Sequence, residues 1–197
     1  MFTGIISNLG RIRSVARGGG ARIVFETAYD TASIAMGASI ACSGVCLTVV
    51  DKGPGWFASD LSAETLARST AADWRAGTAV HLQRSLKLGD ELGGHLVFGH
   101  VDGVGALAER HPDGESLRLV FQAPAELLRL VAVKGSLAVD GVSLTVNRVD
   151  DAAGGFEVTI VPHTARATTL GQSRPGTRVN LEIDMLARYV QRLLAKD

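Results

Sequence analysis

The side chains best suited to chemistry form two polar pairs, each in a short strand-like segment. In ACSGVCLTV at 41–49, Cys46 and Thr48 alternate with apolar residues, as Ser143 and Thr145 do in AVDGVSLTV at 138–146. Because successive side chains of a strand point to opposite faces, each pair shares one face. A thiol or hydroxyl beside a glycine suits a place where backbone and side chains meet a ligand. The alternative interpretation is an ordinary half-buried strand with its polar side in solvent.

A glycine-rich segment, GGHLVFGHVDG at 93–103, contains the histidines His95 and His100. Histidine titrates near neutral pH, so either side chain could act as a general acid or base, and a structural role is the alternative. As a metal pair they lack a third ligand. The chain has no G-x-x-x-x-G-K-[ST] segment and no G-x-G-x-x-G before an expected helix. The histidine pair therefore predicts no metal site, and the absence of both glycine motifs predicts no nucleotide-phosphate loop.

The two polar pairs belong to an internal duplication. The segments at 41–49 and 138–146 agree at six of nine positions, and RAGTAVHL at 75–82 agrees with RPGTRVNL at 174–181 at five of eight. A period near one hundred residues is the size of a small domain. Divergence at polar positions predicts two related but non-equivalent pockets; the aligned pairs include Cys46 with Ser143, Ser43 with Asp140, Glu64 with His163, and Gly4 with Gly103.

The elements that must position these residues are mostly strands. Short β-branched segments separated by glycine and polar turns favour antiparallel barrels or sandwiches. Each half also has one helical segment, SAETLARST at 62–70 and PHTARATTL at 162–170, and residues 126–133 predict a further helical turn or two. We expect an all-β protein with domains at 1–94 and 95–184.

The tail at 184–197 has a different pattern. Leu186, Tyr189, Val190, Leu193 and Leu194 recur at helical spacing, and Asp184 precedes them as an N-cap. The helix expected at 185–197 has no counterpart after the first repeat. Its periodicity leaves two interpretations open, packing against its own barrel and assembly with other chains.

Bulk composition excludes several classes of protein. Twenty basic and twenty acidic residues cancel among 197, so we expect no binding to nucleic acid. No apolar run is long enough to span a membrane, and the N-terminus lacks the charged region of a secretion signal, so we expect the cytoplasm. The two cysteines, Cys42 and Cys46, would lie about 13 Å apart along a strand, beyond the ~7 Å reach of a disulfide. We expect two free thiols.

Six motifs in order resemble the riboflavin synthase alpha-chain, or lumazine-binding repeat, family: MFTGII, GVCLTV, GGHLVFGHVDG, DGVSLTVN, PHTARATTLG and VNLEID. The resemblance implies two six-stranded antiparallel Greek-key barrels in tandem and a C-terminal helix that assembles a homotrimer. It also implies an active site between barrels of neighbouring subunits, where two molecules of 6,7-dimethyl-8-ribityllumazine exchange a four-carbon unit. The products would be riboflavin and 5-amino-6-(D-ribitylamino)uracil, formed without cofactor or metal as the last step of riboflavin biosynthesis.

The same resemblance suggests an association with lumazine synthase. The main alternative is a non-catalytic lumazine- or flavin-binding antenna or carrier protein, which would be expected to lose polar groups from one barrel. Both polar pairs, together with His100, are present in this chain.

Family residues carried onto this chain predict where substrate binds. The N-terminal pocket is expected to include Gly4, Ile5, Ile6, Cys46, Leu47, Thr48, Asp60, Leu61, Ser62, Ala63, Glu64 and Thr65. The C-terminal side is expected to include Gly99, His100, Val101, Lys134, Ser143, Leu144, Thr145, Val161, Pro162, His163, Thr164, Ala165 and Arg166. For catalysis the first candidates are His100 and Ser143, followed by Cys46 and then Asp184. Phe98, where many family members carry a smaller or polar residue, predicts a more apolar pocket edge.

Overall fold

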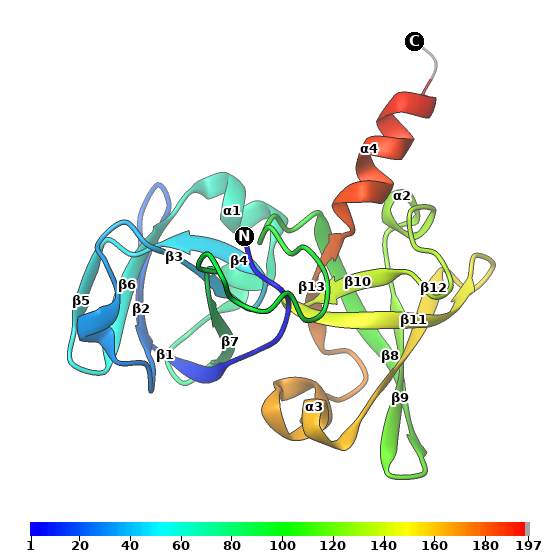
Figure 1. Cartoon of the computed structure of the whole chain (residues 1–197), viewed down its shortest axis with the longest axis horizontal. Coiled ribbons are helices and arrows are strands. Elements are labelled where there is room, and N and C mark those ends of the chain that lie inside the picture. Colours follow the sequence, from blue (N-terminus) through cyan, green and yellow to red (C-terminus); the bar gives the residue numbers. More distant parts are fainter. Residues whose placement is uncertain (196–197) are drawn as a thin grey trace.

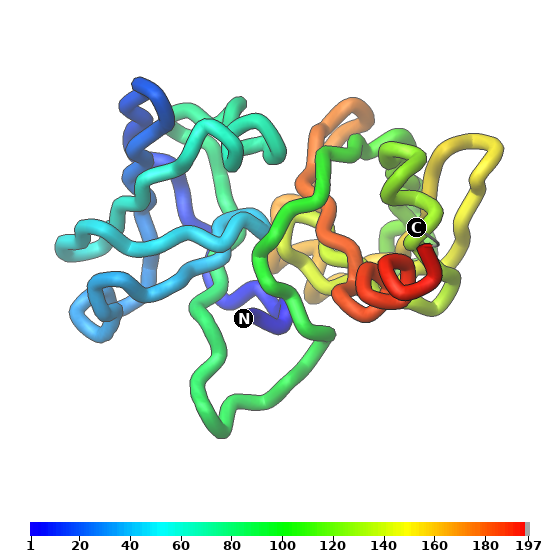
Figure 2. Tube along the Cα trace, turned by 90° about the horizontal axis from the view of Figure 1, so that it is seen from above, coloured from blue at the N-terminus to red at the C-terminus, as the bar shows by residue number. Residues whose placement is uncertain are grey.

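Two β-domains stand side by side, and a C-terminal helix projects from the second (Figure 1). The structure is a computed structural model that describes residues 1–195. Seen from above, the N-terminus lies between the two domains (Figure 2). Among the described residues, no helix is long and apolar enough to cross a membrane. The expected all-β fold with tandem antiparallel barrels is confirmed.

The N-terminal barrel has its strands in the order β4-β3-β7-β1-β2-β6-β5. Turns rich in glycine separate these short strands, as the sequence pattern predicted. The strands are β1 (Asn8–Arg17), β2 (Ala21–Glu26), β3 (Ser39–Cys42), β4 (Val45–Thr48), β5 (Asp51–Gly53), β6 (Trp56–Leu61) and β7 (Ala79–Arg84). Three short helical pieces accompany them: η1 (Thr31–Ser33), α1 (Ala63–Arg68) and η2 (Thr70–Asp73).

The C-terminal barrel closes with the strand order β10-β11-β12-β9-β8-β13. Its strands are β8 (Gly103–Asp113), β9 (Ser116–Gln122), β10 (Ser136–Val139), β11 (Val142–Asp150), β12 (Gly155–Ile160) and β13 (Arg178–Ile183). Its helices are α2 (Ala125–Leu128), α3 (Pro162–Ala167) and η3 (Thr169–Gln172), and α4 (Met185–Leu194) follows the barrel. The helix expected at 126–133 is therefore shorter and begins earlier.

The two halves differ in strand number. The resemblance implied six strands in each, and the C-terminal barrel has six, whereas the N-terminal half has seven. The extra strand arises because the chain leaves strand geometry at 49–50, which divides one long strand into β4 and β5. The equivalent strand β11 stays continuous and absorbs the same bend as a register shift between Val146 and Arg148.

Each barrel has its own apolar core. In the N-terminal barrel the rings of Phe25 and Phe57 stack 4.9 Å apart, and Trp74 meets Phe25 edge-on. In the C-terminal barrel Phe121 and Phe156 stack at 5.5 Å. Two independent cores explain why one sequence pattern can occur twice and fold twice.

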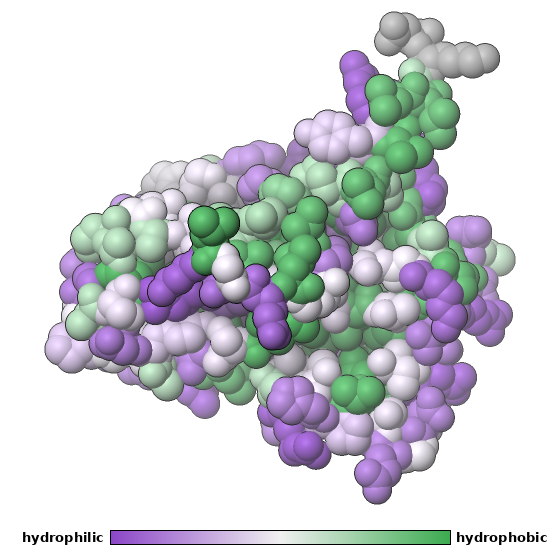
Figure 3. Space-filling model, in the orientation of Figure 1, coloured by the Kyte–Doolittle hydropathy of each residue, from purple (hydrophilic) through white to green (hydrophobic). Residues whose placement is uncertain are grey.

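Helix α4 leaves its apolar face uncovered. Leu186, Leu193 and Leu194 are 72%, 84% and 75% exposed, and Tyr189 is 64% exposed. Figure 3 shows hydrophobic surface along this projecting helix. The interpretation that this apolar face packs against its own barrel is therefore wrong. Within the described part of the helix, Ala187 contacts the core of the C-terminal barrel. Residues 196–197 of the segment expected at 185–197 lie outside the described residues.

The two barrels exchange their leading segments, which we call the crossing segments, residues 2–6 and 97–101. Phe2 and Val97 form an antiparallel bridge, with N···O distances of 2.7 and 3.0 Å. Beyond the bridge, Ile6 packs against the core of the C-terminal barrel, whereas Val101 packs against the core of the N-terminal barrel. Residues 2–6 of the first repeat therefore enter the C-terminal barrel, and residues 97–101 enter the N-terminal barrel.

This exchange corrects one sequence alignment. Gly4 was expected to match Gly103, but the structure matches Gly4 with Gly99 in position. The strands that follow keep that offset, because Gly10 pairs with Val80 on β7 in the way that Gly105 pairs with Val179 on β13. Similarity at a single glycine was too weak to reveal the true register.

A buried polar contact from His81 on β7 also joins the barrels. Its Nδ1 lies 2.9 Å from the Asp140 carbonyl oxygen, and its Nε2 accepts a hydrogen bond from the Thr169 backbone N–H at 2.9 Å. A ring nitrogen that accepts from a backbone N–H is unprotonated. His81 is therefore the neutral Nδ1–H tautomer, donating to Asp140.

Asn180 on β13 makes the reciprocal contact from the other barrel. Its Nδ2 donates to the Ser43 carbonyl oxygen at 2.8 Å, and its Oδ1 accepts from the Thr70 backbone N–H at 2.7 Å. Like His81, it presents one donor and one acceptor across the interface. We call His81 and Asn180 together the interbarrel clasp.

Cys42 and Cys46 are free thiols, as expected. They do not, however, lie on one extended strand, which was the assumption behind that expectation. The chain turns between them: Ser43 and Gly44 have φ of 42° and 82°, and Cys42 pairs with Val45 across the hairpin. Two left-handed residues in a two-residue turn are typical of a tight hairpin. The thiols differ in environment, since Cys42 is buried in the core and burial raises its pKa, whereas Cys46 is partly exposed.

Candidate functional site

Ser143 and Cys46 each lie directly beneath a glycine of a crossing segment. A Cβ on Gly4 would be 2.6 Å from Ser143 Cβ, and a Cβ on Gly99 would be 2.5 Å from Cys46 Cβ. The backbone N–H groups of Ser143 and Cys46 both donate to the glycine carbonyls at 2.9 Å. Only a residue without a side chain permits this approach, and both glycines have positive φ.

The crossing segments therefore lie at the opposite barrels from those expected. Gly4 and Ile6, expected at the N-terminal pocket, lie against the C-terminal barrel, Gly4 beside Ser143 and Ile6 on its core. Ile5 is exposed and lines a hollow with Gln83 and Arg84 of β7 in the N-terminal barrel. Residues 99–101, expected at the C-terminal side, lie beside Cys46 of the N-terminal barrel. The expectation was wrong because it assumed that each repeat builds its own pocket, whereas the bridge between Phe2 and Val97 forces the segments to cross.

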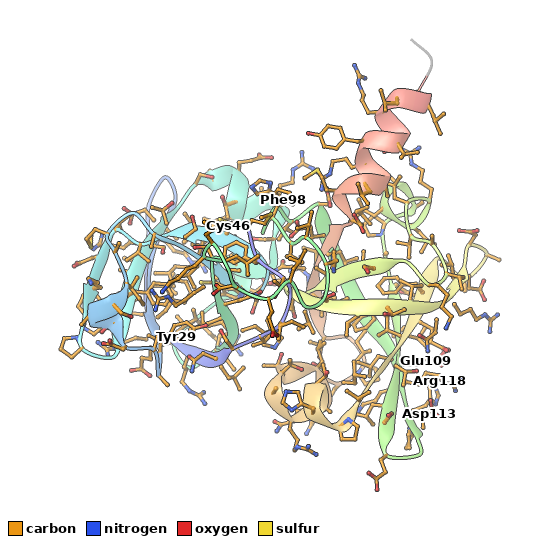
Figure 4. All side chains as sticks on the ribbon, in the orientation of Figure 1. Tyr29, Cys46, Phe98, Glu109, Asp113 and Arg118 are labelled. Atoms are coloured by element: carbon orange, nitrogen blue, oxygen red, sulfur yellow. The ribbon has the colours of Figure 1, made fainter. Side chains whose placement is uncertain are left out.

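A pocket of about 360 Å³ opens beside Cys46 on the N-terminal barrel. It combines a strand, a helix and the second crossing segment. Its lining residues are Val45, Cys46, Glu64, Thr65, Arg68, Ser69, Gly99, His100, Val101 and Asp102. Figure 4 shows Cys46 and Phe98 on the part of this barrel nearest the other one. The ring centroids of Phe98 and His100 lie 6.1 Å apart, although Phe98 is not among the lining residues.

Local sequence explains how helix α1 reaches this pocket. The Ser62 hydroxyl caps the helix by accepting from the Thr65 N–H at 3.1 Å. Along the exposed side, Arg68 bonds to Glu64 at 2.9 Å in an i,i+4 pair. Helix α3 of the second repeat begins instead with Pro162 and has no side-chain cap. The equivalent helices of the two repeats thus differ in charge and in cap.

The C-terminal barrel carries a histidine–serine pair whose two members were each named from the sequence but were not expected to meet. His95 Nδ1 lies 2.7 Å from Ser143 Oγ, although 48 residues separate them. His95 Nε2 is buried and has no hydrogen-bond partner among residues 1–195. Burial lowers the pKa of His95, and the neighbouring charge of Asp184 opposes that shift. A neutral imidazole held against a hydroxyl can accept a proton from it, as a general base does.

The four residues expected to act in catalysis separate into two groups. His100 lines the pocket beside Cys46, whereas Ser143 and Asp184 lie with His95 at the other barrel. Asp184 also caps α4, since its carboxylate accepts from the Leu186 N–H at 2.9 Å. The segment GGHLVFGHVDG offered His95 beside His100 as a possible acid or base, but no spacing rule connects His95 to Ser143.

The other expected site residues have simpler surroundings. Thr48 and Thr145 face outward while Leu47 and Leu144 enter the cores, which confirms the predicted alternation. Asp60 forms an ion pair with Arg22 on the surface. Lys134 is exposed, and its backbone has a positive φ of 67°. The remaining expected residues lie along the two helices or at their starts: Leu61, which is buried, and Ala63, Val161, His163, Thr164, Ala165 and Arg166, which are at least partly exposed.

Within residues 1–195, no three His, Cys, Asp or Glu side chains gather in a metal-binding group. The chemistry available here is that of a thiol, a hydroxyl, two imidazoles and the backbone of two crossing segments. The arrangement is suited to binding two similar molecules and to moving a proton at one of them.

Comparison with known proteins matches this architecture. The model of the lumazine binding domain matches the chain twice, at residues 3–85 and 98–184. Riboflavin synthase of Brucella abortus is 49% identical over 98% of this chain and 98% of its own, and that of Mycobacterium tuberculosis is 45% identical with the same coverage. These matches confirm the resemblance identified from the sequence motifs.

Solved structures of LumP agree in fold. LumP in complex with riboflavin aligns with a TM-score of 0.85 and 22% identity, covering 93% of this chain and 99% of LumP. LumP in complex with 6,7-dimethyl-8-(1'-D-ribityl) lumazine aligns with a TM-score of 0.83. With both repeats matched and close to half of its residues shared with full-length relatives, this chain belongs to the riboflavin synthase family, built from two lumazine binding domains.

Proposed function

We propose that this protein is a riboflavin synthase that converts two molecules of 6,7-dimethyl-8-ribityllumazine into riboflavin and 5-amino-6-(D-ribitylamino)uracil. The single observation that carries the proposal is the repeated glycine-over-nucleophile geometry, Gly99 over Cys46 and Gly4 over Ser143. Two sites of one build suit two copies of one substrate. Their different side chains suit two different roles, one molecule giving and one receiving the four-carbon unit.

Holding two substrates together accounts for a large part of such catalysis. Converting a bimolecular step into an effectively unimolecular one can lower the barrier by about 7–11 kcal/mol. The 7-methyl group of the lumazine is acidic because its carbanion is delocalised over the ring, so a weak base suffices. We propose the pair of His95 and Ser143 as proton acceptor and nucleophile, with His100 and Cys46 acting at the other substrate.

The two substrates must meet face to face, and we propose that a second chain completes the site. The exposed apolar face of α4 supports assembly, since large exposed apolar surfaces mark interaction sites. A homotrimer with sites between neighbouring subunits is the assembly that the family resemblance implies. We further infer a cytoplasmic enzyme from the two free thiols. Association with lumazine synthase remains an expectation of the resemblance.

The deciding experiment is incubation of the purified protein with 6,7-dimethyl-8-ribityllumazine alone, following riboflavin by absorbance and fluorescence. We expect riboflavin without added cofactor or metal. Ser143→Ala, His95→Gln and His100→Gln should each slow turnover, whereas His111→Gln should not, because His111 lies on β8 with an exposed hydrogen bond to Glu109. Tight binding without riboflavin would instead indicate a carrier or antenna protein.

A further inference from the structure

Two equivalent side chains hold the crossing segments in place. At the end of β13, Glu182 accepts from the Phe98 N–H at 2.8 Å with one carboxylate oxygen and from the Gly99 N–H at 3.0 Å with the other. At the end of β7, Gln83 accepts from the Gly4 N–H at 3.0 Å and donates to Thr3 Oγ1 at 2.7 Å. Both side chains are buried.

These contacts connect each barrel to the pocket of the other. Glu182 is a strand residue of the C-terminal barrel, yet the segment it binds covers Cys46 in the N-terminal barrel. Gln83 is a strand residue of the N-terminal barrel, yet the segment it binds covers Ser143. The position of the wall beside Cys46 therefore depends on Glu182, which does not itself line that pocket.

We propose that Glu182 is a positioning residue whose ionised carboxylate holds the 98–100 backbone against Cys46, and that its protonation loosens this pocket wall while the segment held by Gln83 is unaffected. An ionised carboxylate offers both oxygens as acceptors to the two N–H groups. A protonated carboxyl keeps one good acceptor and places an O–H near a backbone N–H. The amide of Gln83 does not titrate.

The surroundings of Glu182 put its titration in the working range of an enzyme. Burial raises its pKa to about 7, the backbone N–H groups of Phe98 and Gly99 oppose that shift, and the nearby charge of Asp102 adds to it. The other charged group at this place is Arg188 on α4, which is bonded to Asp102 at 2.8 Å. Opposite Glu182 on β10 stands the apolar Ala138.

The sign of the pH effect follows from these contacts. Above about pH 7 the carboxylate is ionised and the wall beside Cys46 is held at both N–H groups. As the pH falls through 7, one of these hydrogen bonds is lost and the wall loosens. Losing one charge-assisted hydrogen bond corresponds to a change of about tenfold or more in affinity at that pocket.

The first test reads the wall directly and needs no ligand. Cys46 is partly exposed and Cys42 is buried, so iodoacetamide at pH 8 should alkylate Cys46 first. We expect alkylation several-fold faster in Glu182→Gln than in the matched control Glu157→Gln, whose carboxylate lies on β12 and bonds to Arg118. Equal rates in the two variants would overturn the proposal.

The second test rests on the proposed function and uses titration with 6,7-dimethyl-8-ribityllumazine between about pH 5.5 and 8.5. In the wild-type protein one of two sites should weaken about tenfold toward low pH, and in Glu182→Gln that site should be weak and independent of pH. Gln83→Glu should make the second site pH-dependent as well. Wild-type affinities that do not change with pH at either site would overturn the proposal, even if Glu182→Gln failed to fold.

The two proposals fail in different ways. If neither the wild type nor Glu157→Gln bound the lumazine or formed riboflavin, the proposed function would be wrong, and the alkylation rates would still decide the role of Glu182. If both were fully active and Glu182→Gln matched them at every pH, only the role of Glu182 would be wrong.

Discussion

Replacing His81 by asparagine should change how the stability of this protein depends on pH. In the interbarrel clasp, the neutral His81 ring accepts from the Thr169 N–H and donates to the Asp140 carbonyl. Protonation would turn the accepting nitrogen into a donor that faces the Thr169 N–H and can then bond only to the Thr169 hydroxyl oxygen, 2.9 Å away. Asn180 makes the reciprocal contact with an amide that does not titrate. His81→Asn therefore keeps the kind of contact and removes the titration.

The size of the effect follows from the pKa of His81, which burial lowers from 6.5 to about 4, against the opposing hydrogen bond to Asp140. Because the unfolded chain binds this proton more tightly, the contribution of His81 to stability is complete above pH 6.5. It is lost as the pH falls from there toward 4. One pKa unit corresponds to about 1.4 kcal/mol, so about 3 kcal/mol of unfolding free energy separates the ends of this window.

The assay is urea unfolding followed by tryptophan fluorescence at intervals between about pH 4 and 7.5. Trp56 and Trp74 both belong to the N-terminal barrel, so the signal reports the barrel that carries His81. The wild-type curve alone is not decisive, because burial raises the pKa of Asp140 to about 7 and gives a slope of opposite sign. The informative quantity is the difference between variant and wild type.

That difference should move by about 3 kcal/mol in favour of His81→Asn as the pH falls through the window. The control is His111→Asn, which replaces an exposed histidine hydrogen-bonded to Glu109 at the surface and should not reproduce the shift of about 3 kcal/mol. If the His81→Asn curve were parallel to the wild-type curve, the neutral tautomer and its role in the clasp would be refuted.

Three further outcomes are expected. Gly99→Ala should cost at least about 1–2 kcal/mol and lower the melting temperature, because its Cβ would meet Cys46 at a positive φ; an unchanged melting temperature would contradict this close approach. Asp140→Asn should stabilise the protein more at pH 8 than at pH 5, because burial raises the pKa of that carboxyl to about 7; an equal effect at both pH values would count against it. Deleting residues 185–197 should slow sedimentation, and an unchanged profile would show that α4 does not organise the assembly.

Much of the fold was predictable because it depends on local patterns. Alternation along 45–49 and 142–146 placed Cys46 and Ser143 on the outer faces, and glycine turns separated the strands. The internal duplication predicted two domains, and the ordered motifs predicted the family. The helical spacing of Leu186, Tyr189 and Leu193 predicted α4.

The site was only partly predictable. Cys46, His100 and Ser143 were named as catalytic candidates from the sequence. His95 was named only as one of two histidines able to act as a general acid or base, and Glu182 was not named. His95 meets a residue 48 positions away, and Glu182 binds backbone 83 to 84 positions away. The alignment of 75–82 with 174–181, extended by one residue, sets Gln83 against Glu182. It could not show what either side chain touches.

The sequence by itself determined the number of domains, their strand pattern, the family and the residue types at the two pockets, because these depend on local spacing and on motifs. The tertiary structure alone decided which barrel each crossing segment enters. Both barrels share one pattern, so either could accept residues 2–6 or 97–101 equally well by sequence. The bridge between Phe2 and Val97 and the contacts of Gly4 and Gly99 settle that choice, since strand pairing over long separations depends on neighbours in space.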